Sequence, residues 1–266
     1  MNHVSISDEA ILGSGTVDRL ASDGFVLLDR LCDIELVESM LEVARHRARV
    51  LREALGGRDI GIGSAAGYLE IVQRSPGRWD VPISLQLFGL ENERMPWWPL
   101  VAAVLGEDAE HSFSGVVSSD PGSPPQCWHT DSPHLHAEHH EAHALNVLLA
   151  LHDVPMEMGP TECARGSHFL TNHLRNPVLV LEELIYQHPG TSPERLVSGT
   201  GLPVPERFAS SLAAGSCLVF DDRILHRGLA NQTNSIRHVA YISYRRRGYS
   251  ANTHFESQRS VFDARK

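Results

Sequence analysis

The chain has 266 residues, 42% of them hydrophobic and 21% charged, which is enough apolar material for a sizeable core. Its 33 acidic and 23 basic residues give a net charge of −10, which argues against general nucleic-acid binding because that depends on a basic surface. Four cysteines without a Cys-x-x-Cys pair are expected to be reduced thiols. The sequence shows no signal-peptide pattern, and its longest apolar run, near 145–151, is far too short to span a bilayer, so we expect a cytoplasmic protein without a membrane segment.

The first hundred residues predict helices around one short strand. Residues 16–23 favour a short helix that leads into an apolar strand over 25–28. A long helix is predicted after Asp33, which is a good N-cap, because apolar residues recur at helical spacing until the glycines at 56–57 end it. This helix is expected to brace a sheet. Residues 99–105 predict a further helix, with proline in its first turn.

From residue 111 onward the pattern changes to short strands separated by turns rich in proline, glycine and asparagine. The strands are predicted over 112–118, 126–131, 144–151, 216–220 and 236–244. Such spacing is typical of a cupin-like double-sheet jelly roll, or double-stranded β-helix. We expect one domain over 1–266, mainly β with helical additions (α+β), with a helical and lid portion over 1–110 and a jelly-roll core over 111–250. Short helices are predicted within the core at 178–186 and after Ser192.

A histidine and a carboxylate two residues apart stand in the segment Gln126-Cys-Trp-His-Thr-Asp131. Side chains alternate between the faces of an extended segment, so His129 and Asp131 would point the same way and could grip one metal ion. A second histidine, His226, ends an apolar stretch much later in the chain. Two histidines and one carboxylate form the facial triad of non-haem Fe(II) oxygenases. The triplet alone is weak evidence, because a chain with 16 histidines contains about one His-x-Asp by chance.

The setting of these residues is more specific than the triplet itself. Four features occur in order: Trp128-His-Thr-Asp131; Asp153-Val154 before Gly159-Pro-Thr-Glu-Cys-Ala-Arg-Gly-Ser-His168; Ala214-Gly-Ser-Cys-Leu-Val-Phe220 leading to His226; and Arg237 beyond that histidine. In these features the chain resembles the phytanoyl-CoA dioxygenase family of Fe(II)/2-oxoglutarate-dependent oxygenases. Residues 20–28 are similar to the start of that family. Arg165 departs from the family's usual proline before Gly-Ser-His, and we expect this to alter the stiffness of the loop and not the iron site.

The resemblance implies an enzyme that uses Fe(II), 2-oxoglutarate and O2. His129, Asp131 and His226 would bind the iron and form the catalytic centre. Three protein ligands would leave three positions open for a bidentate 2-oxo acid and dioxygen. Related halogenases lack the carboxylate, so the presence of Asp131 argues against halogenation.

Arg237 is the candidate for holding the distal carboxylate of 2-oxoglutarate, because a guanidinium matches a carboxylate with two charge-assisted hydrogen bonds. The turn-forming stretch 228–235 would let the next strand run antiparallel beside the segment that ends at His226, which would return Arg237 to the iron. Further candidates, chosen by their place in the family pattern or on the strand of Arg237, are Thr161, Ser243 and, more weakly, Gln126.

In a resembling enzyme, residues 56–98 would cover the mouth of the barrel. Five side chains there are candidates for contacting substrate, although packing is the commoner role for each: Tyr68, Arg74, Arg78, Trp79 and Trp97. Residues 134–143 carry five further histidines and offer rival His-x-Glu pairs at 136–138 and 139–141. We assign these pairs to a polar connection with no more than adventitious metal binding.

The leading hypothesis is a dioxygenase that hydroxylates a small organic metabolite, such as an intermediate of antibiotic biosynthesis, while 2-oxoglutarate is decarboxylated to succinate. The same iron chemistry could give desaturation, cyclisation or epimerisation. A fatty acyl-CoA is an alternative substrate, although no residue marks a CoA site. A zinc hydrolase with the same three ligands and a non-catalytic jelly-roll binding module are the competing classes. The sequence leaves open the substrate, the carbon attacked, and whether the chain is a monomer or a homodimer.

Overall fold

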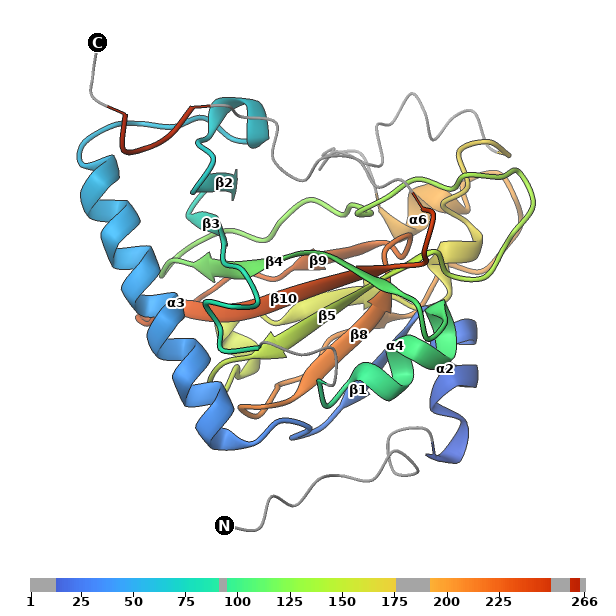
Figure 1. The fold of residues 1–266 in the computed structure, drawn as a ribbon. Coiled ribbons are helices and arrows are strands. Elements are labelled where there is room, and N and C mark those ends of the chain that lie inside the picture. The colour runs from blue at the N-terminus through green and yellow to red at the C-terminus, as the bar shows by residue number, and fades with distance from the viewer. Residues whose placement is uncertain (1–12, 91–94, 176–191, 250–258, 264–266) are drawn as a thin grey trace.

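The computed structural model describes residues 13–90, 95–175, 192–249 and 259–263 (Figure 1). Their strands form two antiparallel sheets, one of seven strands in the order β1-β8-β5-β10-β4-β3-β2 and one of three in the order β7-β6-β9. The strands are β1 (Phe25–Leu28), β2 (Val72–Ser75), β3 (Arg78–Pro82), β4 (Glu110–Ser119), β5 (Ala144–Ala150), β6 (Thr161–Ala164), β7 (Arg207–Phe208), β8 (Cys217–Asp221), β9 (His226–Gly228) and β10 (Arg237–Arg245). The α-helices are α2 (Thr16–Asp23), α3 (Ile34–Leu55), α4 (Trp98–Leu105) and α6 (Pro193–Leu196). This α+β arrangement is the jelly roll that the strand pattern predicted.

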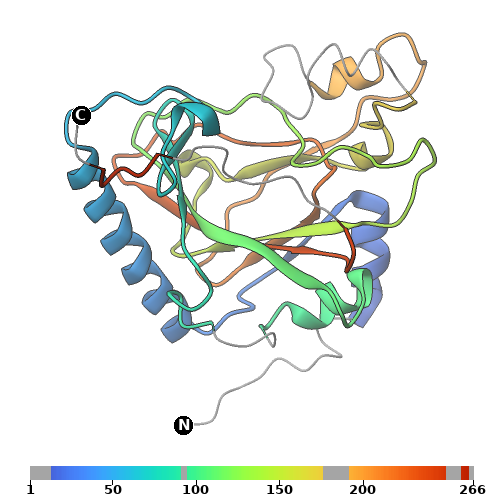
Figure 2. The same cartoon turned by 45° about the horizontal axis from the view of Figure 1, so that its top comes forward.

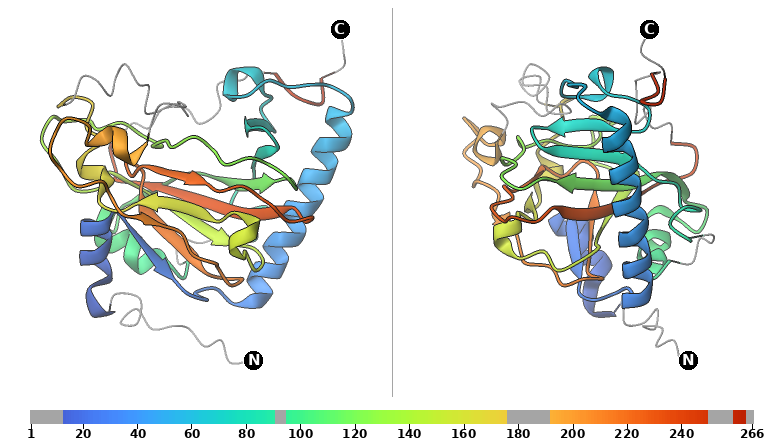
Figure 3. Two further views of the ribbon diagram at one scale, coloured as in Figure 1. Left: turned by 180° about the vertical axis from the view of Figure 1, so that it is seen from behind. Right: turned by 90° about the vertical axis from the view of Figure 1, so that its left-hand side faces the viewer.

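The central strands β5 and β10 place side chains alternately on the two faces of the larger sheet. On the outer face, Val147, Ala240 and Ile242 are buried in the main hydrophobic cluster. Helix α3 runs across the strands and adds its apolar residues to the same cluster, so it braces the sheet as predicted (Figure 3). On the inner face, Asn146 of β5 stands directly opposite Ser243 of β10. The outer face therefore builds the main core, and the inner face carries a polar pair at the centre of the sheet.

A second apolar cluster joins the two sheets. It consists of Phe25, Cys163, Leu218, Phe220 and Ile224, and it packs β6 of the smaller sheet against β1 and β8 of the larger one. Burial of a large apolar side chain stabilises a fold by about 1.5–3 kcal/mol. This contact holds β9, which pairs with β6, at the inner face of the larger sheet.

The predicted helices at 16–23, after Asp33 and at 99–105 are confirmed by α2, α3 and α4. Within the core, Ser192 caps α6 by accepting a hydrogen bond from the Arg195 amide, and the helix predicted at 178–186 lies outside the described residues. The first 110 residues also supply β1, β2 and β3 to the larger sheet. Helices α3 and α6 lie at opposite ends of the molecule (Figure 2). No helix in the described ranges has the length and apolar character needed to cross a bilayer.

Two strand predictions were wrong. Residues 126–131 form only an isolated bridge, at His129, because their backbone hydrogen bonds to Gly228, His226 and Asp222 do not keep the single register of a regular ladder. The strand of Arg237 does not pair with β9 but lies between β4 and β5. The turn before it crosses from the smaller sheet to the larger one, and Asn231 fixes this crossing by donating to the carbonyl of Ser119 at the end of β4, at 3.0 Å.

Candidate metal centre

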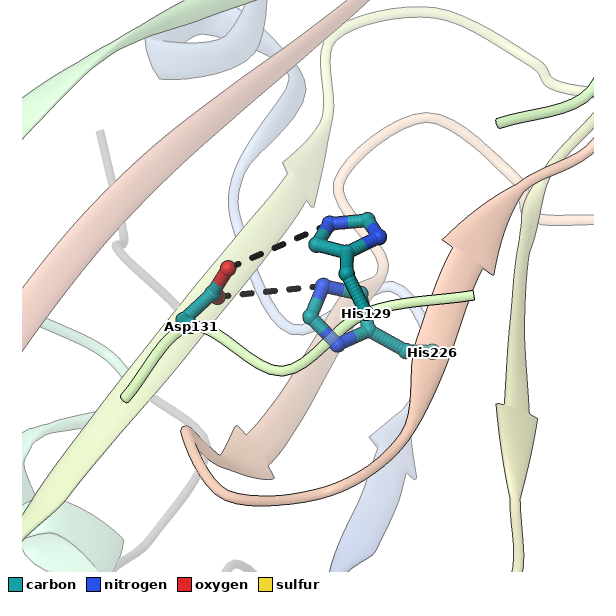
Figure 4. Close-up of side chains that lie close together, drawn as sticks. All are labelled: His129, Asp131 and His226. Atoms are coloured by element: carbon teal, nitrogen blue, oxygen red, sulfur yellow. Dashed lines mark ion pairs between the residues drawn. The ribbon is translucent and has the colours of Figure 1, made fainter. Parts of the chain in front are cut away.

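His129, Asp131 and His226 converge on one point (Figure 4). One potential ligand atom from each residue lies within 4.8 Å of the others. His129 Nε2 is 4.0 Å from Asp131 Oδ1, and His226 Nε2 is 3.7 Å from Asp131 Oδ2. The two histidines are largely buried, whereas the Asp131 side chain keeps 37% of its exposure. The cluster therefore has a protein side and an open side.

Backbone hydrogen bonds bring these residues together from distant parts of the chain. The amide of His129 donates to the carbonyl of His226 at 3.0 Å, and the reverse bond is 2.9 Å. Two residues further on, the Asp131 amide donates to the Asp222 carbonyl at 2.8 Å. His129 and Asp131 consequently project on the same side, as the predicted alternation required, although the segment is not a regular strand.

The environment of both histidines prepares Nε2 for a metal. His129 Nδ1 lies 3.0 Å from the carbonyl of Cys127, and His226 Nδ1 lies 3.2 Å from that of Ile224. A carbonyl can only accept, so each Nδ1 carries the proton and each Nε2 offers a lone pair. Burial lowers the pKa of both rings to about 4, with a further contribution from His226 at His129. Two neutral imidazoles and a carboxylate fit a divalent transition metal such as Fe(II).

Arg237 and Arg78 form a buried cationic pair near this cluster. Arg237 is 3% exposed and donates from one terminal nitrogen to Ser119 Oγ at 2.9 Å, while its Nε and other terminal nitrogen have no partner in the described chain. Burial and the charge of Arg78 lower the pKa of Arg237 to about 9, and burial lowers that of Arg78 to about 10. Arg78 also acts electrostatically on His129. This concentration of buried positive charge favours a bound anion.

Arg78 is fixed by the smaller sheet and by Gln126. Its guanidinium donates to Gln126 Oε1 at 2.8 Å and to the Leu229 carbonyl at 2.9 Å. It lies so close to Gly228 that a Cβ there would be 1.7 Å from the guanidinium nitrogen. Thr161 pairs with Gly228 across β6 and β9, so its side chain belongs to the same face. Gln126 therefore contacts Arg78 directly, and Thr161 lies beside it.

Sequence reasoning missed a hydrogen-bonded chain behind Asp131. Asn146 donates from Nδ2 to Asp131 Oδ2 at 2.6 Å, and Ser243 Oγ donates to Asn146 Oδ1. Ser243, which was expected near the cosubstrate, thus contacts Asn146, and Asn146 in turn contacts the candidate ligand Asp131. The signal that could have found Asn146 is its place as the one polar residue in the predicted strand over 144–151.

The five predicted substrate residues differ in their surroundings. Arg74 forms an ion pair with Asp80 at 2.7 Å, and Asp80 also accepts from the Tyr241 hydroxyl at 2.8 Å. Burial tends to lower the pKa of Arg74, but Asp80 and, more weakly, Asp131 raise it above its usual value. Arg74 is therefore within electrostatic range of the metal centre. Among the five, Arg74 and Arg78 are the two whose charges act on residues of this centre.

The aromatic candidates have their contacts elsewhere. Trp97 has no exposed surface and donates to the Tyr244 hydroxyl at 3.0 Å, so the expectation that it contacts substrate was wrong, because α4 packs it into the core. Trp79 lies on the opposite face of β3 from Arg78, and it donates to Asp120 at 2.7 Å. Tyr68 receives cation–π contacts from Arg58 and Arg259.

The rival histidine pairs at 136–138 and 139–141 belong to no further cluster of three ligand atoms in the described chain. No other group of three His, Cys, Asp or Glu side chains in the described ranges brings its ligand atoms together as the 129, 131 and 226 cluster does. The rings of His136 and His140 contact each other at an angle of 44°, with centroids 4.6 Å apart, and His139 packs on Phe169 at 4.3 Å.

The sequence matches the family model described as phytanoyl-CoA dioxygenase (PhyH) over residues 20–239. This span contains the three converging side chains and Arg237. The chain belongs to the phytanoyl-CoA dioxygenase family. It is therefore an Fe(II)/2-oxoglutarate-dependent oxygenase, with iron and 2-oxoglutarate as its cofactor and cosubstrate.

Several solved structures share the fold of this family member. SnoN, a non-haem alpha-ketoglutarate-dependent epimerase from nogalamycin biosynthesis, is 18% identical with a TM-score of 0.57, over 86% of this chain and 80% of SnoN. HygX from Streptomyces hygroscopicus, solved with nickel, 2-oxoglutarate and hygromycin B bound, is 14% identical with a TM-score of 0.60, over 93% of each chain. SnoK, a carbocyclase from nogalamycin biosynthesis, is 22% identical with a TM-score of 0.53, over 88% of this chain and 84% of SnoK. At these identities the likeness is one of fold.

Proposed function

We propose that this oxygenase acts on a C–H bond of a small organic metabolite, with hydroxylation as the default outcome and decarboxylation of 2-oxoglutarate to succinate. The observation that carries the proposal is a pair of buried arginines for which the described chain shows no carboxylate partner: Arg78 acts electrostatically on His129 of the His-Asp-His cluster, and Arg237 is close enough to Arg78 to feel its charge. 2-Oxoglutarate fits both the His-Asp-His cluster and the arginine pair, because its 2-oxo-acid end chelates a metal and its distal carboxylate matches a guanidinium.

The residues take the following roles in this proposal. His129 Nε2, Asp131 and His226 Nε2 bind the iron, which when bound supplies the redox chemistry that couples oxidation of the 2-oxo acid by O2 to attack on a substrate C–H bond. Arg237 binds the distal carboxylate, and Arg78, oriented by Gln126, adds positive charge beside it. The Thr161 hydroxyl offers one further hydrogen bond. The protein orients the reactants and keeps water from the buried anion.

The substrate class rests on different support. SnoN, SnoK and HygX are known from nogalamycin biosynthesis or from a complex with hygromycin B, and a natural-product intermediate is therefore the substrate we favour here. The polar group formed by Arg74, Asp80 and Tyr241 would face a hydroxylated or otherwise polar substrate. Epimerisation or cyclisation, as in the names of SnoN and SnoK, and oxidation of a fatty acyl-CoA are the alternatives. We further propose that the enzyme acts in the cytoplasm, where its four thiols would stay reduced.

Anaerobic addition of Fe(II) and then 2-oxoglutarate tests the centre of this proposal. We expect a weak visible charge-transfer band in the wild-type protein, because a 2-oxo acid that chelates Fe(II) absorbs there. His226→Ala should abolish the band, whereas His139→Ala, a matched change at an exposed histidine of the segment 134–143, should retain it.

The outcomes separate the competing classes. A zinc hydrolase or a non-catalytic binding module would give no band with the wild-type protein, and that result would refute the proposed function. A band that persists in His226→Ala would refute the ligand assignment.

A further inference from the structure

Asn146 is a buried amide that faces the candidate metal centre from the centre of the larger sheet. It is 6% exposed and lies on β5, between the apolar residues Leu145 and Val147. A buried amide costs stability unless its donor and acceptor are both satisfied. Here both are, and one of the two partners is the carboxylate of Asp131, at 2.6 Å from Nδ2.

The orientation of this amide follows from its partners. An ionised carboxylate only accepts hydrogen bonds, so Asn146 must present its NH2 group to Asp131. The carbonyl oxygen then faces Ser243, whose hydroxyl donates to it. Ser243 is the direct cross-strand neighbour of Asn146, and it is 4% exposed. The β5 and β10 ladder thus fixes which end of the amide meets the carboxylate.

We propose that Asn146 is a positioning residue that fixes the direction of the Asp131 carboxylate, with Ser243 as its support. The two oxygens of Asp131 face the two histidines, with Oδ1 4.0 Å from His129 Nε2 and Oδ2 3.7 Å from His226 Nε2. The hydrogen bond from Asn146 Nδ2 to Oδ2 limits rotation of the carboxylate, so it sets how Asp131 would be presented to a cation held by both imidazoles.

This inference rests on the metal site of the proposed function, but its test measures metal binding and not turnover. Apo protein is titrated with Co(II), and both the dissociation constant and the visible spectrum of bound Co(II) are measured. Asn146→Leu, which keeps the branched shape of the side chain and removes the donor, should weaken Co(II) binding roughly 10-fold and change the spectrum. Ser243→Ala should shift both in the same direction by less, and Ser243→Thr, which keeps a hydroxyl, should restore them.

A matched control separates positioning from packing. Ser114→Ala removes another buried hydroxyl from the same sheet, one that donates to the carbonyl of Ile83 on the outer face, at 2.7 Å. It should leave Co(II) affinity and spectrum at the wild-type values while costing similar stability, which circular dichroism and urea titration would report. If Ser114→Ala and Ser243→Ala behave alike toward Co(II), the positioning role is refuted.

The remaining outcomes distinguish this proposal from the proposed function. Wild-type Co(II) affinity and spectrum in a folded Asn146→Leu protein would overturn the inference alone. The expected Co(II) effects together with no 2-oxoglutarate band would support the inference and overturn the proposed function. A wild-type protein that takes up no Co(II) would overturn both.

Discussion

Two buried arginines of this protein have opposite surroundings. Arg223, in the turn before β9, donates from Nε and a terminal nitrogen to both oxygens of Asp221, at 2.9 and 2.6 Å. Arg237, at the start of β10, is as deeply buried, yet it has a single hydrogen bond to a serine hydroxyl and two nitrogens without partners in the described chain. Arg223 therefore has a carboxylate partner within the fold, whereas the described chain provides none for Arg237.

The pKa values of the two guanidinium groups distinguish a cation that is neutralised within the fold from one that could bind an anionic ligand. Burial tends to lower the pKa of both guanidinium groups. In Arg223 the carboxylate of Asp221 reverses this and raises the pKa, whereas at Arg237 the charge of Arg78 adds to the effect of burial and the pKa falls to about 9. A fold gains nothing from two adjacent unpaired cations in its interior. Their burial near the candidate metal ligands is therefore a cost in stability that the proposed anionic cosubstrate would offset.

The largest effect is expected at the paired arginine. Asp221→Ala leaves the Arg223 charge buried without its carboxylate, and breaking such a pair destabilises a fold by about 3–5 kcal/mol. Urea denaturation of the metal-free protein measures the loss in the free energy of unfolding. A loss below about 1 kcal/mol would mean that Arg223 finds other partners in the variant. The carboxylate of Asp221 would then not be what distinguishes Arg223 from Arg237.

The unpaired arginine should behave in the opposite way. Arg237→Leu removes a buried charge whose one hydrogen-bond partner in the described chain is a serine hydroxyl, so the free energy of unfolding without ligand should stay the same or rise. Affinity for 2-oxoglutarate should fall by at least ~2 kcal/mol, roughly 30-fold, because the charge-assisted pair is lost. Isothermal titration with Mn(II)-loaded protein measures this, and Arg237→Lys should recover only part of the affinity because an ammonium lacks the planar fork. Equal affinity in the wild type and Arg237→Leu would exclude Arg237 from the cosubstrate site.

Some of these residues could be predicted from sequence because their signal is local. His129 and Asp131 share one short motif, and His226 and Arg237 follow it at a spacing that a family pattern fixes. The prediction that Arg237 approaches the iron rested on a hairpin with β9 that does not form. The chain crosses between sheets instead, and Arg237 is buried beside Arg78 by the pairing of β10 with β4.

The other residues could not be predicted because their contacts depend on register between distant strands. Asn146 meets Ser243 only through the pairing of β5 with β10, and Asp131 only through the anchoring of its loop to the segment before β9. Trp97 shows the reverse error, since an aromatic residue in a suspected lid gives no sign that a helix will bury it. Local patterns identify candidate metal ligands, whereas the pairing of distant strands decides which residues support them.

The smallest effect concerns His238, which follows Arg237 on β10 and faces the other side of the sheet. Burial, and then the charge of His152, lowers the pKa of His238 to about 4, so in the folded protein it stays neutral where an unfolded histidine, with a pKa near 6.5, is protonated. Between these values the unfolded state binds more protons, and stability falls as the pH decreases. From pH 7.5 to 5.5 this one residue should cost roughly 1.4 kcal/mol. His238→Gln should lose that much less than the wild type over the same interval in urea titrations, because the other buried histidines contribute equally to both proteins. If the wild type and His238→Gln lose stability in parallel, His238 has an ordinary histidine pKa in the folded protein. Water would then reach its side chain more easily than its 5% exposure indicates.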